Sequence, residues 1–249
     1  MPALQPSESH FWLCKPNDLD LSVDYMAKLE AVLDDEELAR MRRFKFKEHA
    51  TMFCISHAFT RYVLSCYAPL LPDQWTFRKG EHGKPYVSNI GYTDLYFSLS
   101  HTKGLIALYV AQGSEVGCDV ERRNSKARGS DIAKRFFSTA EVEQYLAVEP
   151  DKQRDRFFDY WSLKESYIKA KGKGLAISLG TFSFSLNERP ITFTTDQVLQ
   201  EQDDKWTFTL LDVGEQHSAA IASQQNKPHL RHWLAQPLLS FQSVELPLR

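Results

Sequence analysis

The sequence has only four cysteines, and their spacing is not that of a disulfide framework or a zinc site. Cys14, Cys54, Cys66 and Cys118 include no Cys-x-x-Cys pair, and each sits among apolar neighbours. This pattern favours reduced thiols in a core over disulfides or a zinc site. The start, MPALQPSESHFW, lacks the basic flank and apolar run of a signal peptide, and no apolar run is long enough to span a bilayer. We therefore expect a cytoplasmic protein without a membrane segment.

An excess of either charge is also absent. Thirty Lys and Arg residues face 32 Asp and Glu residues, for a net charge of −2, which argues against general nucleic-acid binding. The sequence contains neither a Walker-type glycine loop nor a Gly-x-Gly-x-x-Gly motif. Any phosphate ligand would therefore have to be held by side chains. The length of 249 residues suits one large domain or two small ones.

The stretch FFDYWSLKESYIKAKGKGL at 157–175 predicts a helix with charged groups concentrated on one face. Trp161, Glu165 and Lys169 fall at i, i+4 and i+8, so an aromatic ring, a carboxylate and an ammonium share that face. The neighbouring apolar stripe consists of Tyr160, Leu163, Tyr167 and Ala170, and Gly172 and Gly174 end the helix. For this helix alone, an ordinary surface ion pair between Glu165 and Lys169 is the favoured interpretation.

A second charged pattern occupies the predicted strand EVGCDVE at 115–121. Its apolar positions are Val116, Cys118 and Val120, and they alternate with Gly117, Asp119 and Glu121. Asp119 and Glu121 therefore project from the same face. Neighbouring carboxylates repel and keep their charges only in water or around a cation, and their oxygens suit magnesium. A solvated strand face is the alternative.

The remaining patterns alternate between strand and helix periods. Strands are expected at 10–14, 95–101, 105–110 and 216–223, and a long core helix at 48–67. A basic run precedes this helix and comprises Arg40, Arg42, Arg43, Lys45 and Lys47. Such a run is usually a solvated face. The segment 224–249 carries enough large apolar residues to lie against the body.

Four short motifs follow one another in a specific order. They are GKPY at 83–86, FSLSH at 97–101, GCDVE at 117–121 and WSLKESYIK at 161–169. The last two contain the patterns Gly-x-Asp-x-Glu and Trp-x-x-Lys-Glu-x-x-x-Lys. In this combination the sequence resembles the Sfp-type 4′-phosphopantetheinyl transferase family over roughly residues 30–185.

The resemblance implies an α+β fold of two similar halves related by a pseudo-twofold axis. Each half would be a small antiparallel sheet packed on a long helix, with the active site in the cleft between them. We expect these halves at 1–113, for coenzyme A contacts, and 114–223, for magnesium and catalysis. Residues 224–249 would form a tail packed on the body. A pseudo-dimeric chain of this kind is expected to be a monomer.

The resemblance also implies a magnesium-dependent enzyme. It would transfer 4′-phosphopantetheine from coenzyme A to a serine of an apo acyl or peptidyl carrier protein and release adenosine 3′,5′-bisphosphate. Asp119, Glu121 and Glu165 resemble the magnesium ligands. Glu165 is also the candidate general base, acting directly or through a water molecule. Lys169 resembles the lysine that binds the diphosphate.

Further residues resemble the family's contacts to coenzyme A. Lys84, Ser100 and His101 would contact the adenosine end and its 3′-phosphate, together with Arg40 from the N-terminal helix. Glu37 stands where some members of the family carry a second lysine. This difference leaves the strength of the 3′-phosphate contact open.

The carrier protein is expected to dock on a basic segment that follows the acidic strand. Its residues are Arg122, Arg123, Lys126, Arg128, Lys134 and Arg135, which would steer an acidic partner toward the site. A solvated loop is the alternative. Two other functions also remain open, namely another magnesium-dependent phosphodiester hydrolase and a non-catalytic binding module for coenzyme A or a carrier protein. Neither a nucleic acid nor a membrane is expected as a partner.

Overall fold

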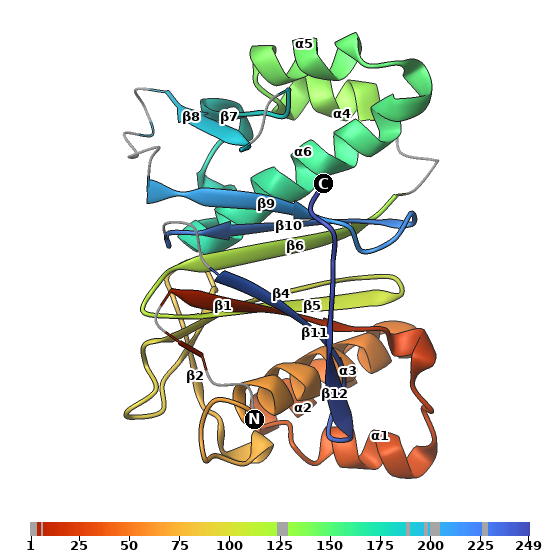
Figure 1. Cartoon of the computed structure of the whole chain (residues 1–249). Helices are drawn as coiled ribbons and strands as arrows, with labels where there is room; N and C mark the ends of the chain where they lie inside the picture. Colours follow the sequence, from red (N-terminus) through yellow and green to blue (C-terminus); the bar gives the residue numbers. More distant parts are fainter. Residues whose placement is uncertain are drawn as a thin grey trace.

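Two sheets lie face to face between two long helices, so the chain forms four layers of a mixed α+β fold (Figure 1). The computed structural model describes residues 4–5, 7–123, 129–187, 190–196, 199, 205–225 and 229–249. Among these residues, no helix combines the length and the apolar character needed to cross a membrane.

The N-terminal half places helix α3 under a five-stranded sheet. Its elements are β1 (Glu8–Cys14), α1 (Val23–Glu30), α2 (Asp35–Arg42), α3 (Lys47–Leu64), β2 (Phe77–Lys79), β3 (Pro85–Val87), β4 (Leu95–Thr102) and β5 (Leu105–Gln112). Strands β4 and β5 pair antiparallel from Leu95–Gln112 to Thr102–Leu105, as the alternating pattern predicts. Helix α3 buries Ile55, Phe59 and Val63 against the sheet, because these residues repeat at the helical spacing.

The C-terminal half places helix α6 on a three-stranded sheet in the order β6-β10-β9. Its elements are β6 (Val116–Arg122), α4 (Gly129–Phe136), α5 (Thr139–Ala147), α6 (Pro150–Lys171), β7 (Phe182–Ser185), β8 (Thr192–Thr195), β9 (Thr207–Leu211) and β10 (His217–Ser223). Helix α6 starts seven residues before the predicted start, at Pro150, because a proline is well tolerated in the first turn. It ends where predicted, with Gly172 in the left-handed conformation at φ 63°.

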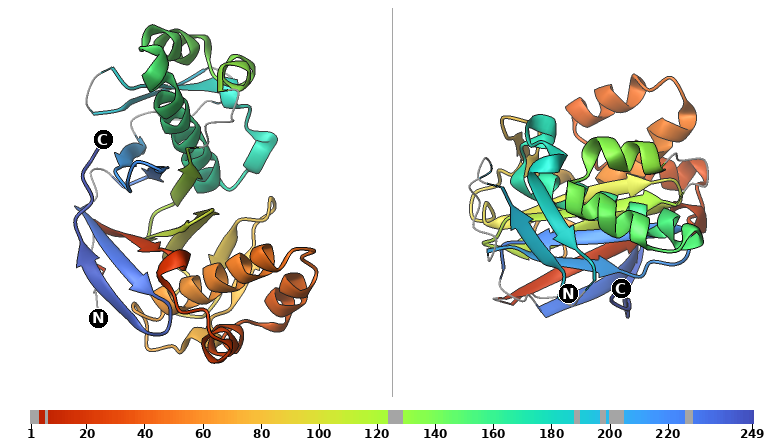
Figure 2. Two further views of the ribbon diagram at one scale, coloured as in Figure 1. Left: turned by 90° about the vertical axis from the view of Figure 1, so that its right-hand side faces the viewer. Right: turned by 90° about the horizontal axis from the view of Figure 1, so that it is seen from above.

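The segment predicted as a tail forms two strands of the N-terminal sheet. Strands β11 (His229–Gln236) and β12 (Ser240–Val244) extend it to the order β12-β11-β1-β5-β4. Strand β11 runs parallel to β1, and Trp12 stacks on Trp233 with 5.3 Å between ring centroids. After β12 the chain runs along one side of the molecule to the C-terminal half (Figures 1 and 2), where Leu248 bridges to Leu211. The segment therefore connects both halves.

In addition to the apolar contact between their faces, the two sheets are linked at their edge strands β4 and β6. No ladder pairing joins these two strands. Two serine side chains of β4 make the connection, because Ser98 Oγ accepts from the Cys118 N–H at 3.0 Å and Ser100 Oγ accepts from the Val120 N–H at 3.2 Å. The serines of the FSLSH motif thus fix the position of the acidic strand β6.

Gly117 of β6 allows α6 to approach the strand closely. A Cβ atom at this position would lie 1.9 Å from the Ser166 carbonyl oxygen and 2.5 Å from the Ala170 nitrogen. These are backbone atoms of a packed helix, so they cannot move aside as a flexible side chain can. Gly117 therefore sets the distance between the acidic strand and the face of α6 that carries Lys169.

We predict that Gly117→Ala lowers both stability and activity. The added methyl group must push α6 away from β6, which we expect to cost about 3 kcal/mol in the free energy of unfolding. Urea denaturation followed by circular dichroism measures this loss. Gly180→Ala is the matched control, because its methyl group would enter open space. Equal denaturation midpoints for the two variants would contradict the prediction.

Candidate active site

Asp119, Lys169 and Ser100 meet where the two halves join. Asp119 is 3% exposed, and its Oδ1 accepts from Lys169 Nζ at 2.7 Å and from Ser100 Oγ at 3.0 Å. Burial alone would lower the pKa of Lys169, but the neighbouring Asp119 carboxylate outweighs it and the pKa is raised. The ammonium therefore stays charged beside the carboxylate. Strands β6 and β4 and helix α6 each supply one member of this cluster.

The Ser100 hydroxyl is fully engaged within the protein. It donates to Asp119, and it accepts from Lys169 Nζ at 2.7 Å and from the backbone N–H of Val120. A hydroxyl has one proton and two lone pairs, so these three bonds use its whole capacity. Ser100 consequently orients Asp119 and Lys169 in this structure. Its predicted contact to coenzyme A stays a prediction.

Two further carboxylates lie in the electrostatic neighbourhood of Asp119. Burial, and next the charge of Asp119, raise the pKa of Glu121 to about 7, and Glu165 contributes in the same direction. Burial and then Asp119 also raise the pKa of Glu165, while Lys169 partly opposes the shift. Within residues 157–170 of α6, Trp161, Glu165 and Lys169 are half-buried and the other residues are buried, as their predicted common face requires. The three predicted metal ligands are therefore neighbours that repel one another.

The three carboxylates are of the kind that magnesium binds, although their oxygens do not converge on one point in this structure. Among the described residues, no three His, Cys, Asp or Glu side chains are positioned to hold a metal ion as they stand. The Oδ2 atom of Asp119, however, is buried and has no hydrogen-bond partner in the described part of the chain, which is costly for a carboxylate oxygen. Magnesium usually takes one or two carboxylates and completes its shell with water and phosphate oxygens. The chemistry of these residues therefore fits such an ion.

Lys84 lies apart from this cluster, at the other end of β6. Its Nζ donates to Glu115 at 2.5 Å, to the Ala170 carbonyl at 2.6 Å and to the Val116 carbonyl at 3.2 Å. Its side chain is 7% exposed, and burial lowers its pKa. All three ammonium protons are thus used to fasten the β2–β3 hairpin to the C-terminal half. To bind a phosphate, the Lys84 ammonium would have to leave these acceptors.

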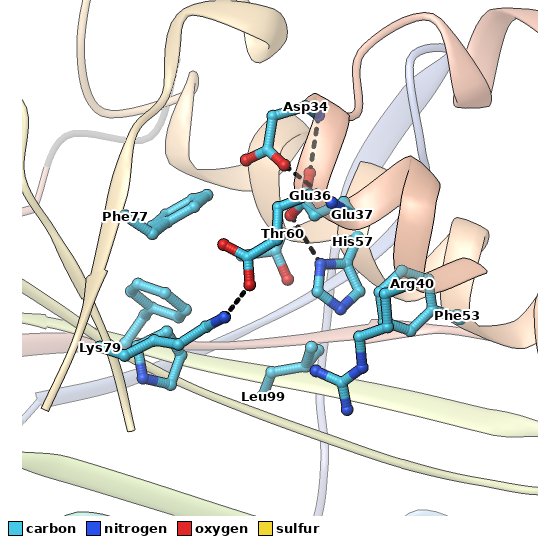
Figure 3. A pocket seen from close by; sticks show the side chains of 12 residues that line it. Asp34, Glu36, Glu37, Arg40, Phe53, His57, Thr60, Phe77, Lys79 and Leu99 are labelled. Carbon is cyan, nitrogen blue, oxygen red and sulfur yellow. Dashed lines mark hydrogen bonds and ion pairs between the residues drawn. The ribbon is translucent and has the colours of Figure 1, made fainter. Parts of the chain in front are cut away.

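Arg40 lines an open cavity of the N-terminal half (Figure 3). The cavity lies between α2, α3 and the strands β2 and β4, and its lining comprises Asp34, Glu36, Glu37, Arg40, Phe53, His57, Thr60, Phe77, Lys79, Pro85, Phe97 and Leu99. The Arg40 guanidinium carbon lies 5.3 Å from the centroid of the Phe53 ring. Among the described residues Arg40 forms no ion pair. Its charge is therefore available to a ligand.

His101 stands on strand β4, which lines this cavity with Phe97 and Leu99 and reaches the Asp119 cluster with Ser100. On β4 it follows Leu99 at the strand period of two, so both face the cavity side while Ser100 faces Asp119. The ring is exposed at its surface. Neighbouring groups nevertheless lower the pKa of His101, first by displacing solvent and then through the charges of Lys169 and His57. Strand β4 thus borders both the cavity that Arg40 lines and the Asp119 cluster.

A buried arginine that the sequence pattern does not reveal supports the cavity wall. Arg61 is completely buried, and it donates to Glu37 and Asp34 at 2.8 Å each and to the Trp75 carbonyl at 2.8 Å. Its position among polar residues of a helix predicts an exposed side chain. Asp34 and Glu37, which form the capping box of α2, neutralise it instead. Only the fold brings Arg61 to these two acids, because they stand 24 and 27 positions before it in the chain.

A second buried pair lies within the C-terminal half. Lys164 Nζ lies 2.8 Å from Glu141 Oε2, and both side chains are 0% exposed. Lys164 also donates to the carbonyls of Leu179 and Phe182 at 2.7 and 2.8 Å. Glu141 takes the capping-box position after Ser138 that its spacing predicts. The first lysine of the WSLKESYIK motif thus supports the structure and is not part of the Asp119 cluster.

The basic segment after β6 is described only in part. Lys126 and Arg128 lie outside the described residues. Arg123 does not lie on an open surface: its Nη1 donates to the Glu215 carbonyl at 3.1 Å, and its other nitrogens lie 3.6 Å from Asp155 and Asp159. Arg123 therefore stabilises the C-terminal half. Docking of a carrier on the rest of the segment stays a prediction.

Several known proteins of similar sequence are 4′-phosphopantetheinyl transferases. The family model of the 4′-phosphopantetheinyl transferase superfamily matches residues 115–222. The chain is 34% identical over 230 residues to the 4′-phosphopantetheinyl transferase HetI of Nostoc sp., which covers 86% of this chain and 93% of that protein. It is 33% identical over 171 residues to the 4′-phosphopantetheinyl transferase Sfp of Bacillus subtilis, with coverage of 69% and 74%. A further Bacillus subtilis 4′-phosphopantetheinyl transferase is 36% identical over 171 residues, again with coverage of 69% and 74%.

Proposed function

The chain belongs to the Sfp-type 4′-phosphopantetheinyl transferases, and from this we propose that it transfers 4′-phosphopantetheine from coenzyme A to a serine of an apo acyl or peptidyl carrier protein. The observation that carries the proposal is the cluster at the junction of the two halves. There the buried Asp119 keeps one oxygen without a partner among the described residues, while Lys169 stays charged beside it. A carboxylate and an ammonium so placed suit a metal-bound diphosphate.

The reaction needs one bond to form and one to break. The serine oxygen attacks the β-phosphorus of coenzyme A, and the bond from that phosphorus to the bridging oxygen breaks. Adenosine 3′,5′-bisphosphate leaves with the electron pair. Glu165 receives the serine proton, directly or through water, and its raised pKa suits a proton acceptor. Lys169 stabilises the charge that develops on the phosphate oxygens.

Asp119, Glu121 and Glu165 would hold a magnesium ion, which would neutralise charge on the diphosphate. In the same proposal Arg40 and His101 bind the 3′-phosphate at the other end of coenzyme A.

The proposal also divides the chain into two halves, at 1–113 and 114–223, with β11 and β12 of segment 224–249 added to the first half. Since both halves supply residues to one site, we expect the active form to be a monomer.

The transfer itself is tested with purified carriers. The protein is incubated with coenzyme A, magnesium and a panel of apo acyl and peptidyl carrier proteins, and mass spectrometry follows each carrier. We expect at least one carrier to gain the mass of phosphopantetheine. Cleavage of coenzyme A without modification of any carrier would indicate a hydrolase. Binding without either product would indicate a binding module.

We predict that Arg40→Ala raises the KM for coenzyme A about tenfold and leaves kcat nearly unchanged, because a charge-assisted contact to phosphate is lost far from the reacting bond. The preference for coenzyme A over dephospho-coenzyme A, which lacks the 3′-phosphate, should fall by the same factor. Arg42→Ala is the control, since Arg42 is also exposed on α2 but does not line the cavity. An unchanged preference in Arg40→Ala would remove Arg40 from this role.

A further inference from the structure

The cavity beside Arg40 carries three acids, which is unexpected for a phosphate site. They are Asp34, Glu36 and Glu37. Each has a cationic partner, but Arg61 is shared by Asp34 and Glu37 while Lys79 pairs with Glu36, so these ion pairs leave one negative charge. With Arg40 added, the cavity and its wall are close to neutral. Any further positive charge on its lining therefore makes the cavity attractive to an anion.

His57 of α3 can supply a further positive charge on the cavity lining, and Glu37 fixes the position of the His57 ring. The Nδ1 atom of His57 lies 2.7 Å from Glu37 Oε1, while the other Glu37 oxygen bonds Arg61. Burial would raise the pKa of Glu37, but the hydrogen bond from His57 and the charge of Arg61 outweigh it, so the pKa is lowered. The carboxylate is thus ionised. An ionised carboxylate can only accept a hydrogen bond, so the Nδ1 atom of His57 carries the proton and Glu37 fixes the orientation of the ring.

The orientation of the ring leaves its second nitrogen for a ligand. The imidazole stacks on Phe53 with 3.9 Å between ring centroids, and the Arg40 guanidinium lies over the same Phe53 ring. Figure 3 shows the second nitrogen of His57 turned away from Glu37, toward Leu99 and the side to which the Arg40 guanidinium points. No hydrogen bond to this nitrogen is found within the described ranges, and the side chain is 26% exposed. His57 and Arg40 therefore present donors to the same space.

A series of basic residues also leads from His57 to the Asp119 cluster. The charge of His57 acts on His101 of β4, and so does that of Lys169. Arg40, His57, His101 and Lys169 come from four different elements, α2, α3, β4 and α6. Such a series suits a ligand with one phosphate group at the cavity and a diphosphate at the cluster. Coenzyme A has this distribution of charge.

We infer that His57 is a specificity-determining residue for the 3′-phosphate of coenzyme A, and that Glu37 is its positioning residue. This inference rests on the proposed function, since it takes coenzyme A as the ligand. The imidazolium donates from its second nitrogen to a phosphate oxygen, beside the Arg40 guanidinium. Glu37 therefore supports phosphate binding indirectly, although its own charge would oppose it.

The test compares the binding of coenzyme A and dephospho-coenzyme A by isothermal titration calorimetry in the presence of magnesium, on the full-length chain. We expect His57→Gln to weaken coenzyme A binding about tenfold, the typical loss of one charge-assisted hydrogen bond, with no change for dephospho-coenzyme A. Glu37→Gln should reduce the same preference. Because Glu37 also binds the buried Arg61, circular dichroism must first show that this variant folds. If it does not, His57→Gln still decides the question.

His49→Gln is the matched control, since His49 is exposed on the same helix and does not line the cavity. It should keep the wild-type preference for coenzyme A. A His57→Gln variant with the wild-type preference, or with equal losses for both ligands, would overturn the inference while carrier modification by the wild type upheld the proposed function. A wild type that binds no coenzyme A would overturn both.

Discussion

Asp119→Asn is expected to lower kcat for carrier modification by about 1,000-fold, which corresponds to about 4 kcal/mol of transition-state stabilisation. The substitution keeps the shape of the side chain and removes its charge. The buried oxygen that has no partner in the described protein then becomes part of an amide that binds a cation poorly, and Lys169 loses the carboxylate that orients it. Mass spectrometry of the carrier at saturating coenzyme A and magnesium measures the rate.

Asp73→Asn is the control for this experiment, since Asp73 is an exposed aspartate in the N-terminal half. It should modify the carrier at the wild-type rate. Circular dichroism must show that Asp119→Asn is folded, so that a lost rate reports on the site. A folded Asp119→Asn variant with near wild-type kcat would remove Asp119 from the chemistry.

Lys164→Met is expected to lower the free energy of unfolding by about 3–5 kcal/mol, because it leaves the charge of a fully buried partner without compensation. Of its donors within the described residues, Glu141 would keep the backbone N–H groups of Ser138 and Phe184. The carbonyls of Leu179 and Phe182 would lose their ammonium donor. Urea denaturation followed by circular dichroism measures the change.

Lys152→Met provides the comparison on the same helix. Lys152 pairs with Glu149, but both side chains are more than two-thirds exposed, so its removal should cost less than about 1 kcal/mol. The double variant Lys164→Met with Glu141→Leu should recover part of the loss, because it removes the unpaired charge. Equal denaturation midpoints for Lys164→Met and Lys152→Met would show that the buried pair contributes nothing.

The face of α6 and the acidic strand are predictable because they follow local periodicity. Trp161, Glu165 and Lys169 share a face at the helical spacing, and Asp119 and Glu121 share one at the strand spacing. The structure shows half-buried residues on the helix face and a buried Asp119 beneath it. Periodicity predicts which residues share a face of a helix or strand. It does not predict which other element packs against that face.

The sequence does not predict the burial or the partners of residues whose contacts lie far away in the chain. Lys84 stands in a motif that suggests a ligand contact, yet its ammonium bonds Glu115 and two carbonyls. Arg61 stands among polar residues of a helix, yet it is completely buried. No spacing rule predicts either outcome, because a buried cation is stable only where distant acceptors converge on it.

The sequence by itself determined the α+β class, the strand and helix that carry the acids, and the family, because each rests on local order along the chain. The tertiary structure alone decided that β11 and β12 complete the N-terminal sheet and that Gly117 lets Lys169 reach Asp119. It also decided that Glu37 holds His57 beside Arg40. These features depend on contacts between residues far apart in the chain. Such contacts contribute stabilising free energy only after the layers have packed.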